Sequence, residues 1–210
     1  MNRCFVKRST ALLVVALVVA FAATASAGPI YTVGPGAGFS ATELDSAGTR
    51  INVERDPVFL AAGRYTVLSF AMNTGNAAGY VTPFLLTGSP SIYTVAWVGD
   101  RFDPAASGIQ TDAYLPGTEE FVLAAGGNVY AGFYQSSGLV YLRSNVGYTD
   151  HDNTPTEPTY VGETVSNFSH ANWPRTYAFE VNVEYIPEPA TLSLLALGGL
   201  ALLRRRRGSG

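Results

Sequence analysis

Residues 177–185 read Tyr-Ala-Phe-Glu-Val-Asn-Val-Glu-Tyr, and this stretch decides the fold. Large apolar or aromatic side chains stand at every odd position, and small or polar ones stand at every even position. A period of two places the two sets on opposite faces of an extended chain, whereas a helix would need a period of 3.6. We therefore predict an antiparallel strand over 177–185 with one face in the core. The core-facing side chains are Tyr177, Phe179, Val181, Val183 and Tyr185.

Shorter apolar segments with strand-like patterns lie upstream of this stretch. Gly, Asn, Ser and Pro residues separate them, and no part of the body has the pattern of an amphipathic helix. Many short strands at this spacing predict an all-β fold, an antiparallel β-sandwich of the jelly-roll kind rather than an immunoglobulin-like one. The expected strands cover 51–53, 64–72, 81–86, 92–98, 120–123, 129–135 and 139–143.

Two connections between these segments stand out. Residues 136–138, Ser-Ser-Gly, are short enough to close a hairpin between the strands on either side. Residues 148–176 are rich in Thr, Pro, Asn and Asp, and we expect them to form a long loop. No internal repeat and no domain boundary interrupts 28–186, so this range is predicted to be one β-sandwich domain.

The predicted domain is acidic. Between residues 28 and 186 there are six arginines, no lysine and 15 acidic residues, so the formal net charge is −9. Proteins that bind nucleic acid neutralise phosphates with clustered Lys and Arg, so this composition excludes a nucleic-acid partner. The single cysteine, Cys4, precedes the domain, which therefore contains no disulfide and no cysteine nucleophile.

The N-terminal segment, 1–27, has the three parts of a secretory signal peptide. Basic residues at 3, 7 and 8 precede a 13-residue run of Ala, Leu, Val and Phe over 11–23. Ala25 and Ala27 then supply the small side chains that a signal peptidase needs, so we expect cleavage before Gly28. The run spans only about 20 Å as a helix, too short to cross a ~30 Å hydrocarbon core comfortably. The sequence thus predicts export by the secretion machinery.

The C-terminal segment, 187–207, has a different order of parts. The tripeptide Pro187, Glu188, Pro189 comes first and ends the last strand. A 14-residue run over 190–203 follows, with seven leucines, and we expect it to be a transmembrane helix. At about 1.5 Å per residue this helix reaches only about 21 Å, which suits a temporary anchor. The run is followed by a membrane stop of four basic side chains, Arg204, Arg205, Arg206 and Arg207.

These parts, in this order, resemble the PEP-CTERM sorting signal. The resemblance covers only the last 21 to 24 residues, and it implies recognition by exosortase, a membrane protease-transpeptidase. It also implies a Gram-negative cell that makes extracellular polysaccharide. The expected partners are therefore the secretion machinery, signal peptidase, an exosortase-like enzyme, the inner membrane transiently, and extracellular polysaccharide. The expected location is the cell envelope, the outer surface or the extracellular matrix.

Few residues of the body suggest a metal or catalytic site. Asp150, Asp152 and Glu157 are a candidate cation site, because Ca²⁺ prefers several oxygen ligands from one loop. Their spacing fits no EF-hand, and acidic loop residues are usually only solvated, so we expect no metal and no cofactor. Asp100 and Asp103 have the same two interpretations, a cation site or solvated loop carboxylates. No Gly-x-Ser-x-Gly elbow is present, and we expect the protein not to be an enzyme.

Aromatic side chains crowd the second half of the chain. Most aromatics in strands belong to the core, whereas exposed ones can stack on sugar rings. The residues in question are Tyr130, Phe133, Tyr134, Tyr141, Tyr148, Tyr160, Trp173 and Tyr177. We therefore predict a structural or adhesive surface protein, with a carbohydrate-binding module as the alternative and a secreted hydrolase as the third reading.

Overall fold

The computed structural model describes residues 27–45, 48–75, 79–90, 92–115, 117–144, 147, 149–152, 156–166, 168–170 and 174–187. Pro29–Ile186 form one compact unit. The remaining residues, 1–28 and 187–210, form a separate unit, of which only Ala27, Gly28 and Pro187 are described.

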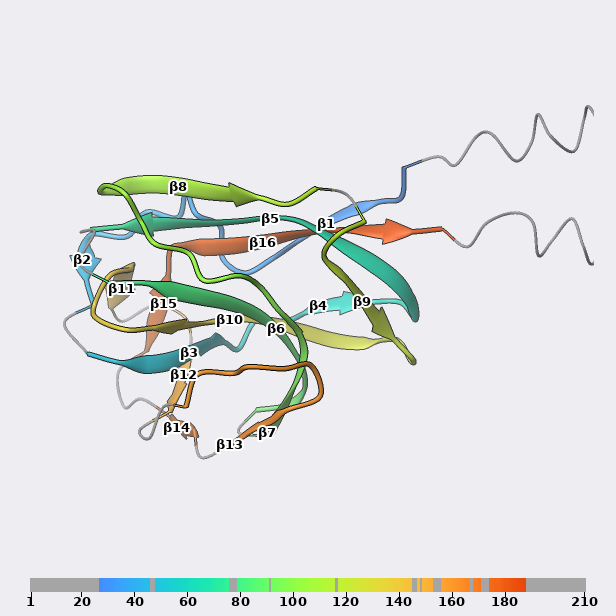
Figure 1. Cartoon of the computed structure of the whole chain (residues 1–210). Helices are drawn as coiled ribbons and strands as arrows, with labels where there is room; N and C mark the ends of the chain where they lie inside the picture. Colours follow the sequence, from blue (N-terminus) through green and yellow to red (C-terminus); the bar gives the residue numbers. More distant parts are fainter. Residues whose placement is uncertain are drawn as a thin grey trace, which may run out of the picture. The chain divides into compact units, whose positions relative to one another are not determined.

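One sheet of five strands is built around the long strand β5 (Gly63–Thr74) (Figure 1). On one side β5 pairs with β16 (Phe179–Ile186), which pairs in turn with β1 (Ile30–Val33). On the other side two strands share β5: β9 (Glu120–Leu123) pairs with its first residues and β8 (Gly108–Ala113) pairs with its last. All these pairings are antiparallel, as the period-two pattern predicts.

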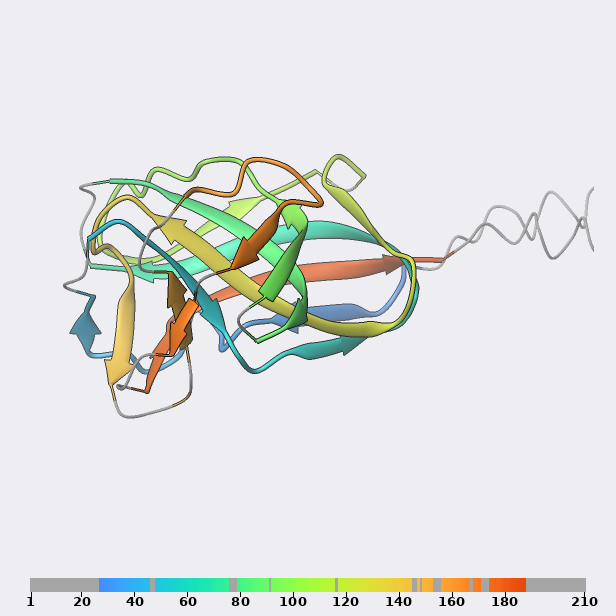
Figure 2. The ribbon, with the colours of Figure 1, turned by 90° about the horizontal axis from the view of Figure 1, so that it is seen from below.

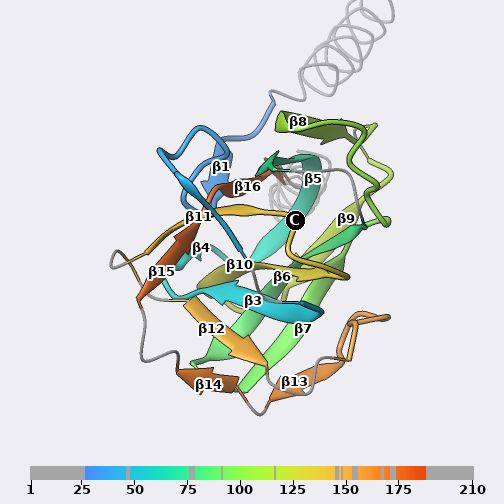
Figure 3. The same ribbon diagram turned by 90° about the vertical axis from the view of Figure 1, so that its left-hand side faces the viewer.

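A second sheet has eight strands in the order β13-β7-β6-β10-β3-β12-β14, with β4 paired to the start of β10. β13 and β14 are separated in the sequence by a single residue, yet they lie at opposite ends of this order. The sheet therefore curls until its two edges approach each other, and Figures 2 and 3 show the resulting half-barrel. The bounds are β3 (Arg50–Glu54), β4 (Val58–Leu60), β6 (Val81–Ser89), β7 (Ile92–Val98), β10 (Gly127–Gln135), β12 (Thr149–Asp152), β13 (Thr164–Ser166) and β14 (Phe168–His170).

A small third sheet completes the domain. It has the order β15 (Arg175–Tyr177), β11 (Tyr141–Ser144), β2 (Glu43–Leu44). Ala178 links this sheet to the five-stranded one, because its amide donates to the carbonyl of Tyr141 at 2.9 Å and its carbonyl accepts from the amide of Asn73 at 2.8 Å.

Two apolar clusters fill the domain, one on each face of the half-barrel. Strand β10 shows the division, since Val129, Ala131 and Phe133 belong to one cluster and Tyr130 and Tyr134 to the other. The first cluster also contains the buried face of the five-stranded sheet, and the second also contains side chains from β13 and β14. A strand that alternates apolar side chains on both faces is thus buried on both faces.

The structure confirms the all-β, antiparallel prediction: among the described residues, all regular structure is strand. Phe179, Val181 and Val183 are fully buried, as the alternation predicts. The predicted strand is nevertheless wrong in its first residues. Tyr177 is buried but belongs to β15, because the chain bends at Ala178 to change sheets.

Three finer predictions need correction or stay open. The jelly-roll sandwich is not confirmed, because the larger sheet curls into a half-barrel. The hairpin at 136–138 is wrong, since β10 pairs with β3, β4 and β6 whereas β11 pairs with β15 and β2. The long loop at 148–176 is also wrong, because β12, β13 and β14 lie in it and complete the larger sheet.

The predicted C-terminal helix over 190–203 lies outside the described residues. Within the described ranges, no helix is long and apolar enough to cross a membrane.

Candidate functional site

The residues predicted from the two ends are described only in part. Ala27 and Pro187 are exposed and Gly28 is half-buried. Ala25, Glu188, Pro189 and the four arginines at 204–207 lie outside the described residues.

The two ends of the domain itself lie side by side. The carbonyl oxygen of Pro29 accepts a hydrogen bond from the amide of Tyr185 at 3.1 Å. One residue further into the domain, Ile30 of β1 pairs with Glu184 of β16. The segment that follows the predicted cleavage position and the segment that precedes the tripeptide are therefore neighbouring, antiparallel strands.

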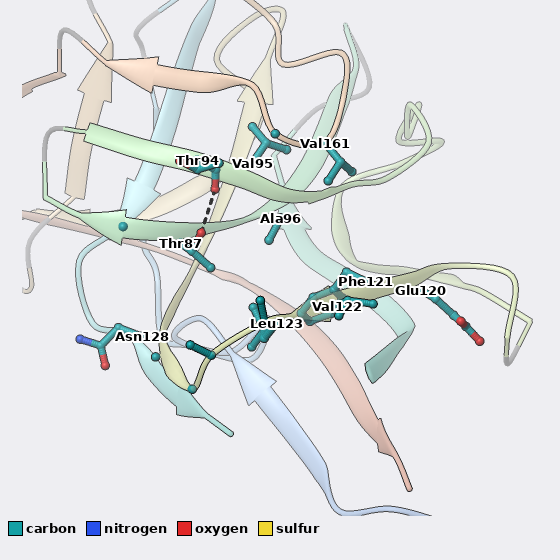
Figure 4. Close-up of a pocket in the computed structure, with 16 residues that line it drawn as sticks. Thr87, Thr94, Val95, Ala96, Glu120, Phe121, Val122, Leu123, Asn128 and Val161 are labelled. Atoms are coloured by element: carbon teal, nitrogen blue, oxygen red, sulfur yellow. Dashed lines mark hydrogen bonds between the residues drawn. The ribbon is translucent and has the colours of Figure 1, made fainter. Parts of the chain in front are cut away.

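A groove of about 720 Å³ opens between the two larger sheets. Figure 4 shows Val95 and Val161 on one side of it and Val122 and Leu123 on the other. The loop over 124–126 and the first residues of β10 also line the groove. Val122 and Val161 are 66% and 60% exposed, so the groove presents apolar surface to solvent.

The polar groups of the groove are few. Thr87 and Thr94 supply hydroxyls, Asn128 supplies an amide, and Glu120 supplies a carboxylate that is paired with Arg64. An apolar hollow with a few hydrogen-bonding groups suits a non-covalently bound ligand. The sequence analysis did not predict this groove, because it treated the Gly- and Asn-containing segments between the predicted strands only as connections. A run of Ala and Gly directly after an apolar strand was the signal available.

A second polar constellation is buried around Asp45, at the end of β2. Asp45 Oδ2 accepts hydrogen bonds from Tyr177 Oη at 2.9 Å and from Gln135 Nε2 at 2.7 Å. Arg175 Nη1 lies 3.4 Å from Asp45 Oδ1. The Asp45 carboxylate thus links β2, β10 and β15. Because a buried polar group needs such partners, these contacts give Asp45 a structural role.

Glu54, at the end of β3, is a buried carboxyl in the same region. Its Oε1 accepts a hydrogen bond from the amide of Tyr177 at 2.8 Å and lies 2.9 Å from Thr149 Oγ1. Burial raises the pKa of Glu54 to about 8, and the hydrogen bonds from Tyr177 and Thr149 oppose that rise. Glu54 therefore carries its proton at neutral pH.

Thr149 Oγ1 lies within hydrogen-bond distance of two acceptors, Glu54 Oε1 and, at 2.7 Å, the carbonyl oxygen of Arg175. A hydroxyl has one proton to donate, so Thr149 donates to one of these two oxygens at a time.

The candidate cation site is not assembled from its described members. Asp150 is fully buried, accepts a hydrogen bond from Tyr93 Oη at 2.9 Å and lies 3.6 Å from Arg55 Nε. Glu157 accepts hydrogen bonds from Tyr80 and Thr82 instead. The side chain of Asp152 lies outside the described residues, and within those residues no three acidic, His or Cys side chains form a metal-binding group.

Most of the candidate sugar-stacking aromatics are core residues. Tyr130, Phe133, Tyr134 and Tyr177 are buried, Tyr141 is half-buried, and Tyr160 is 62% exposed. The side chains of Tyr148 and Trp173 lie outside the described residues. The expectation that most strand aromatics belong to the core is confirmed for the buried four, because β10 is covered on both faces and Tyr177 packs against Phe133.

Comparisons with known proteins bear mainly on the C-terminus. No curated protein matches the chain. One solved structure is described as the cysteine protease and lectin-like domains of Cwp84, a surface layer associated protein of Clostridium difficile. It shares 11% identity over 74% of this chain and 36% of that chain, with a TM-score of 0.40. A likeness of this size carries no argument about fold or function.

The family comparison is specific. Residues 186–207 match the family model of the PEP-CTERM protein-sorting motif, and these residues include the tripeptide, the apolar run and the four arginines. The motif indicates export to the cell envelope or surface and processing by an exosortase-type membrane enzyme. The C-terminal tail of this chain is a PEP-CTERM protein-sorting motif.

Proposed function

We propose that this chain is a non-enzymatic cell-surface or extracellular-matrix protein with a structural or adhesive role. The single observation that carries the proposal is the match to the sorting motif at residues 186–207. The match begins at Ile186, the last residue of β16, so the sorting signal follows the folded domain without a linker. A β domain joined in this way to a sorting signal is cargo that the sorting enzyme releases or transfers.

On this proposal each part of the tail has its own task. The run over 190–203 lodges in the inner membrane after the domain has crossed. The four arginines stay on the cytoplasmic side, because moving each through hydrocarbon costs at least about 2.5 kcal/mol on insertion scales. Pro187, Glu188 and Pro189 then lie at the outer interface, within reach of a membrane-embedded enzyme.

An epitope tag placed after Gly210 tests the proposal. In a host that has the sorting enzyme, the tag is expected to be absent from the mature, surface-exposed protein. Changing residues 187–189 to Ala-Ala-Ala is expected to leave the tagged chain full length in the membrane. A tag that remains on surface-exposed, unmutated protein would make the tail a permanent anchor and overturn the sorting proposal.

Glycan binding is the second candidate, and the groove is the observation that favours it. Its apolar walls and its Thr87, Thr94 and Asn128 side chains could hold a sugar without an exposed aromatic row. A glycan array probed with the signal-processed protein tests this candidate, with Asn128→Ala as the groove variant. Binding that Asn128→Ala weakens supports it, and an array without any bound glycan rejects it. The described lining contains no Ser, His or Cys, so the groove offers no support for a hydrolase.

A further inference from the structure

Four segments of the domain meet at the end from which β16 leaves. Gly63 pairs with Leu123, Gly127 pairs with Leu60, and Ile186 pairs with Arg64. The hydrogen bond from Tyr185 to Pro29 adds the start of the domain. We call this end the tip and define it as residues 29–30, 59–63, 122–127 and 185–186; in Figure 1 it is the end at which the arrow of β16 terminates.

None of the residues that define the tip is charged, and the charged residues beside it are Arg64, which pairs with Val122 and Ile186, and Glu184, which pairs with Ile30. Ile30, Phe59 and Val122 are 62%, 66% and 66% exposed. The loops between these side chains are small and apolar: 61–63 read Ala-Ala-Gly and 124–127 read Ala-Ala-Gly-Gly. A Cβ built on Gly126 would lie 3.3 Å from the ring of Phe59, so the second loop packs on that ring. Single exposed apolar residues are ordinary, but several of them at one end of a domain mark a contact surface.

The length of the chain after the tip identifies the partner. Three residues, 187–189, separate Ile186 from the apolar run at 190–203. An extended chain covers at most about 3.5 Å per residue, so the tip can lie no more than about 14 Å from the start of the inserted run. The polar headgroup region is about 7 Å thick on each side of the bilayer, so Ile186 lies within about 7 Å of the lipid surface or in contact with it.

The charge distribution orients the domain in the same sense. Hydrated acidic side chains stay out of the headgroup boundary, whereas the uncharged residues of the tip can enter it without desolvating a charge. We infer that the tip is a lipid-contacting surface that seats the β domain on the outer face of the bilayer while the tail is inserted. This inference rests on the proposed function, because it requires the inserted tail.

Single-cysteine fluorescence tests the inference with the signal-processed chain. Cys4 lies in the predicted signal segment, so this chain has no competing thiol. Ala125→Cys places an environment-sensitive fluorophore at the tip, and Ser107→Cys places one beside Gly108, which pairs with Thr74 at the far end of β5. The chains are reconstituted into phosphatidylcholine vesicles that carry a nitroxide on the headgroup. The nitroxide is expected to quench the probe at 125 several-fold more than the probe at 107.

Two further variants ask whether tip contacts, rather than the tether alone, produce the quenching. Val122→Asp in the Ala125→Cys chain is expected to reduce it. The matched control, Ile109→Asp, changes a side chain that is 58% exposed on β8, near the far end of β5, and is expected to leave it unchanged. Equal quenching at 125 and 107, or no effect of Val122→Asp, overturns the inference. A third outcome also overturns the inference: the probe at 125 is not quenched by the lipid nitroxide, but its emission shows an apolar environment at high protein concentration. In that case the partner of the tip is a second copy of the chain.

Flotation of the same vesicles separates this inference from the proposed function. Protein that does not float with the lipid contradicts insertion of the tail, and the proposed sorting route fails with it. Protein that floats without selective quenching at 125 overturns only the lipid contact of the tip.

Discussion

The phenolic oxygen of Tyr177 donates a 2.9 Å hydrogen bond to Oδ2 of Asp45, a residue 132 positions away in the chain. Tyr177 ends β15 and Asp45 follows β2, and these two strands flank β11 without pairing with each other. This hydrogen bond therefore connects the two outer strands of the three-stranded sheet through side chains. The two strands do not pair with each other through the backbone. Both residues are buried, so neither can exchange this bond for one to water without opening the domain.

Tyr177→Phe removes only the hydroxyl of this pair. A buried acceptor that loses a donor costs about 1 to 3 kcal/mol, and Asp45 keeps its contacts with Gln135 and Arg175. Urea unfolding is expected to show a loss of stability in this range. Tyr160→Phe, which removes the same hydroxyl from a side chain that is 62% exposed, is the control and should change little. Equal effects of the two variants would contradict a role for the buried bond.

Glu54→Gln tests the protonated state of the buried carboxyl. Glu54 has a pKa of about 8 in the folded chain against its usual value of 4.5, so the folded state holds a proton that the unfolded state releases. The stability from this group is fully present below the unfolded pKa and is lost as the pH rises through the folded pKa, at about 1.4 kcal/mol per pH unit for one proton.

Glutamine copies the neutral carboxyl, so the stability of Glu54→Gln relative to the unmutated chain should rise between about pH 4.5 and pH 8. Unfolding curves measured across that range check the slope, with Glu184→Gln as the control. A difference between Glu54→Gln and the unmutated chain that stays constant with pH would show that Glu54 is ionised in the folded protein.

Phe179→Ala leaves a cavity in the first apolar cluster. The ring is fully buried, and its centroid lies 4.9 Å from that of Phe133 and 6.5 Å from that of Phe70. Truncation of such a ring costs about 3 to 5 kcal/mol. Denaturant unfolding measures the loss, and Glu184→Gln, on the other face of β16, is the control. A loss as small as that of the control would place Phe179 outside the core.

Gly34→Ala tests a backbone constraint just after β1. Gly34 has a φ of +111°, and a Cβ there would lie 2.9 Å from the carbonyl oxygen of Phe179. A residue forced into such a conformation costs about 1 to 3 kcal/mol. Gly38→Ala is the matched control, because its added Cβ meets no atom within 4 Å. Thermal unfolding should therefore separate the two variants, and equal melting temperatures would contradict the predicted clash.

Sequence reasoning located the strands whose two faces differ most clearly. The predicted 92–98 and 120–123 are the observed bounds of β7 and β9, and 64–72 lies within β5. It missed β8 and β12, which contain mostly polar or small residues. A strand of this kind forms because the edge of a neighbouring strand offers unpaired backbone N–H and C=O groups, whatever the hydrophobic pattern of the added residues. That edge exists only after the neighbouring strands have paired, so the local sequence does not show it.

The sorting motif and the strand periodicity are properties of the sequence by itself. A membrane enzyme reads consecutive residues, and a strand's two faces follow from alternate residues, so both signals are local. The tertiary structure decided which distant residues meet: Tyr177 with Asp45, Pro29 with Tyr185, and the four segments of the tip. It also buried Tyr130, Phe133 and Tyr134, which composition alone left free to be surface or core. These outcomes depend on strand order and on the curl of the larger sheet, because the burial of a side chain is set by what packs against it from elsewhere in the chain.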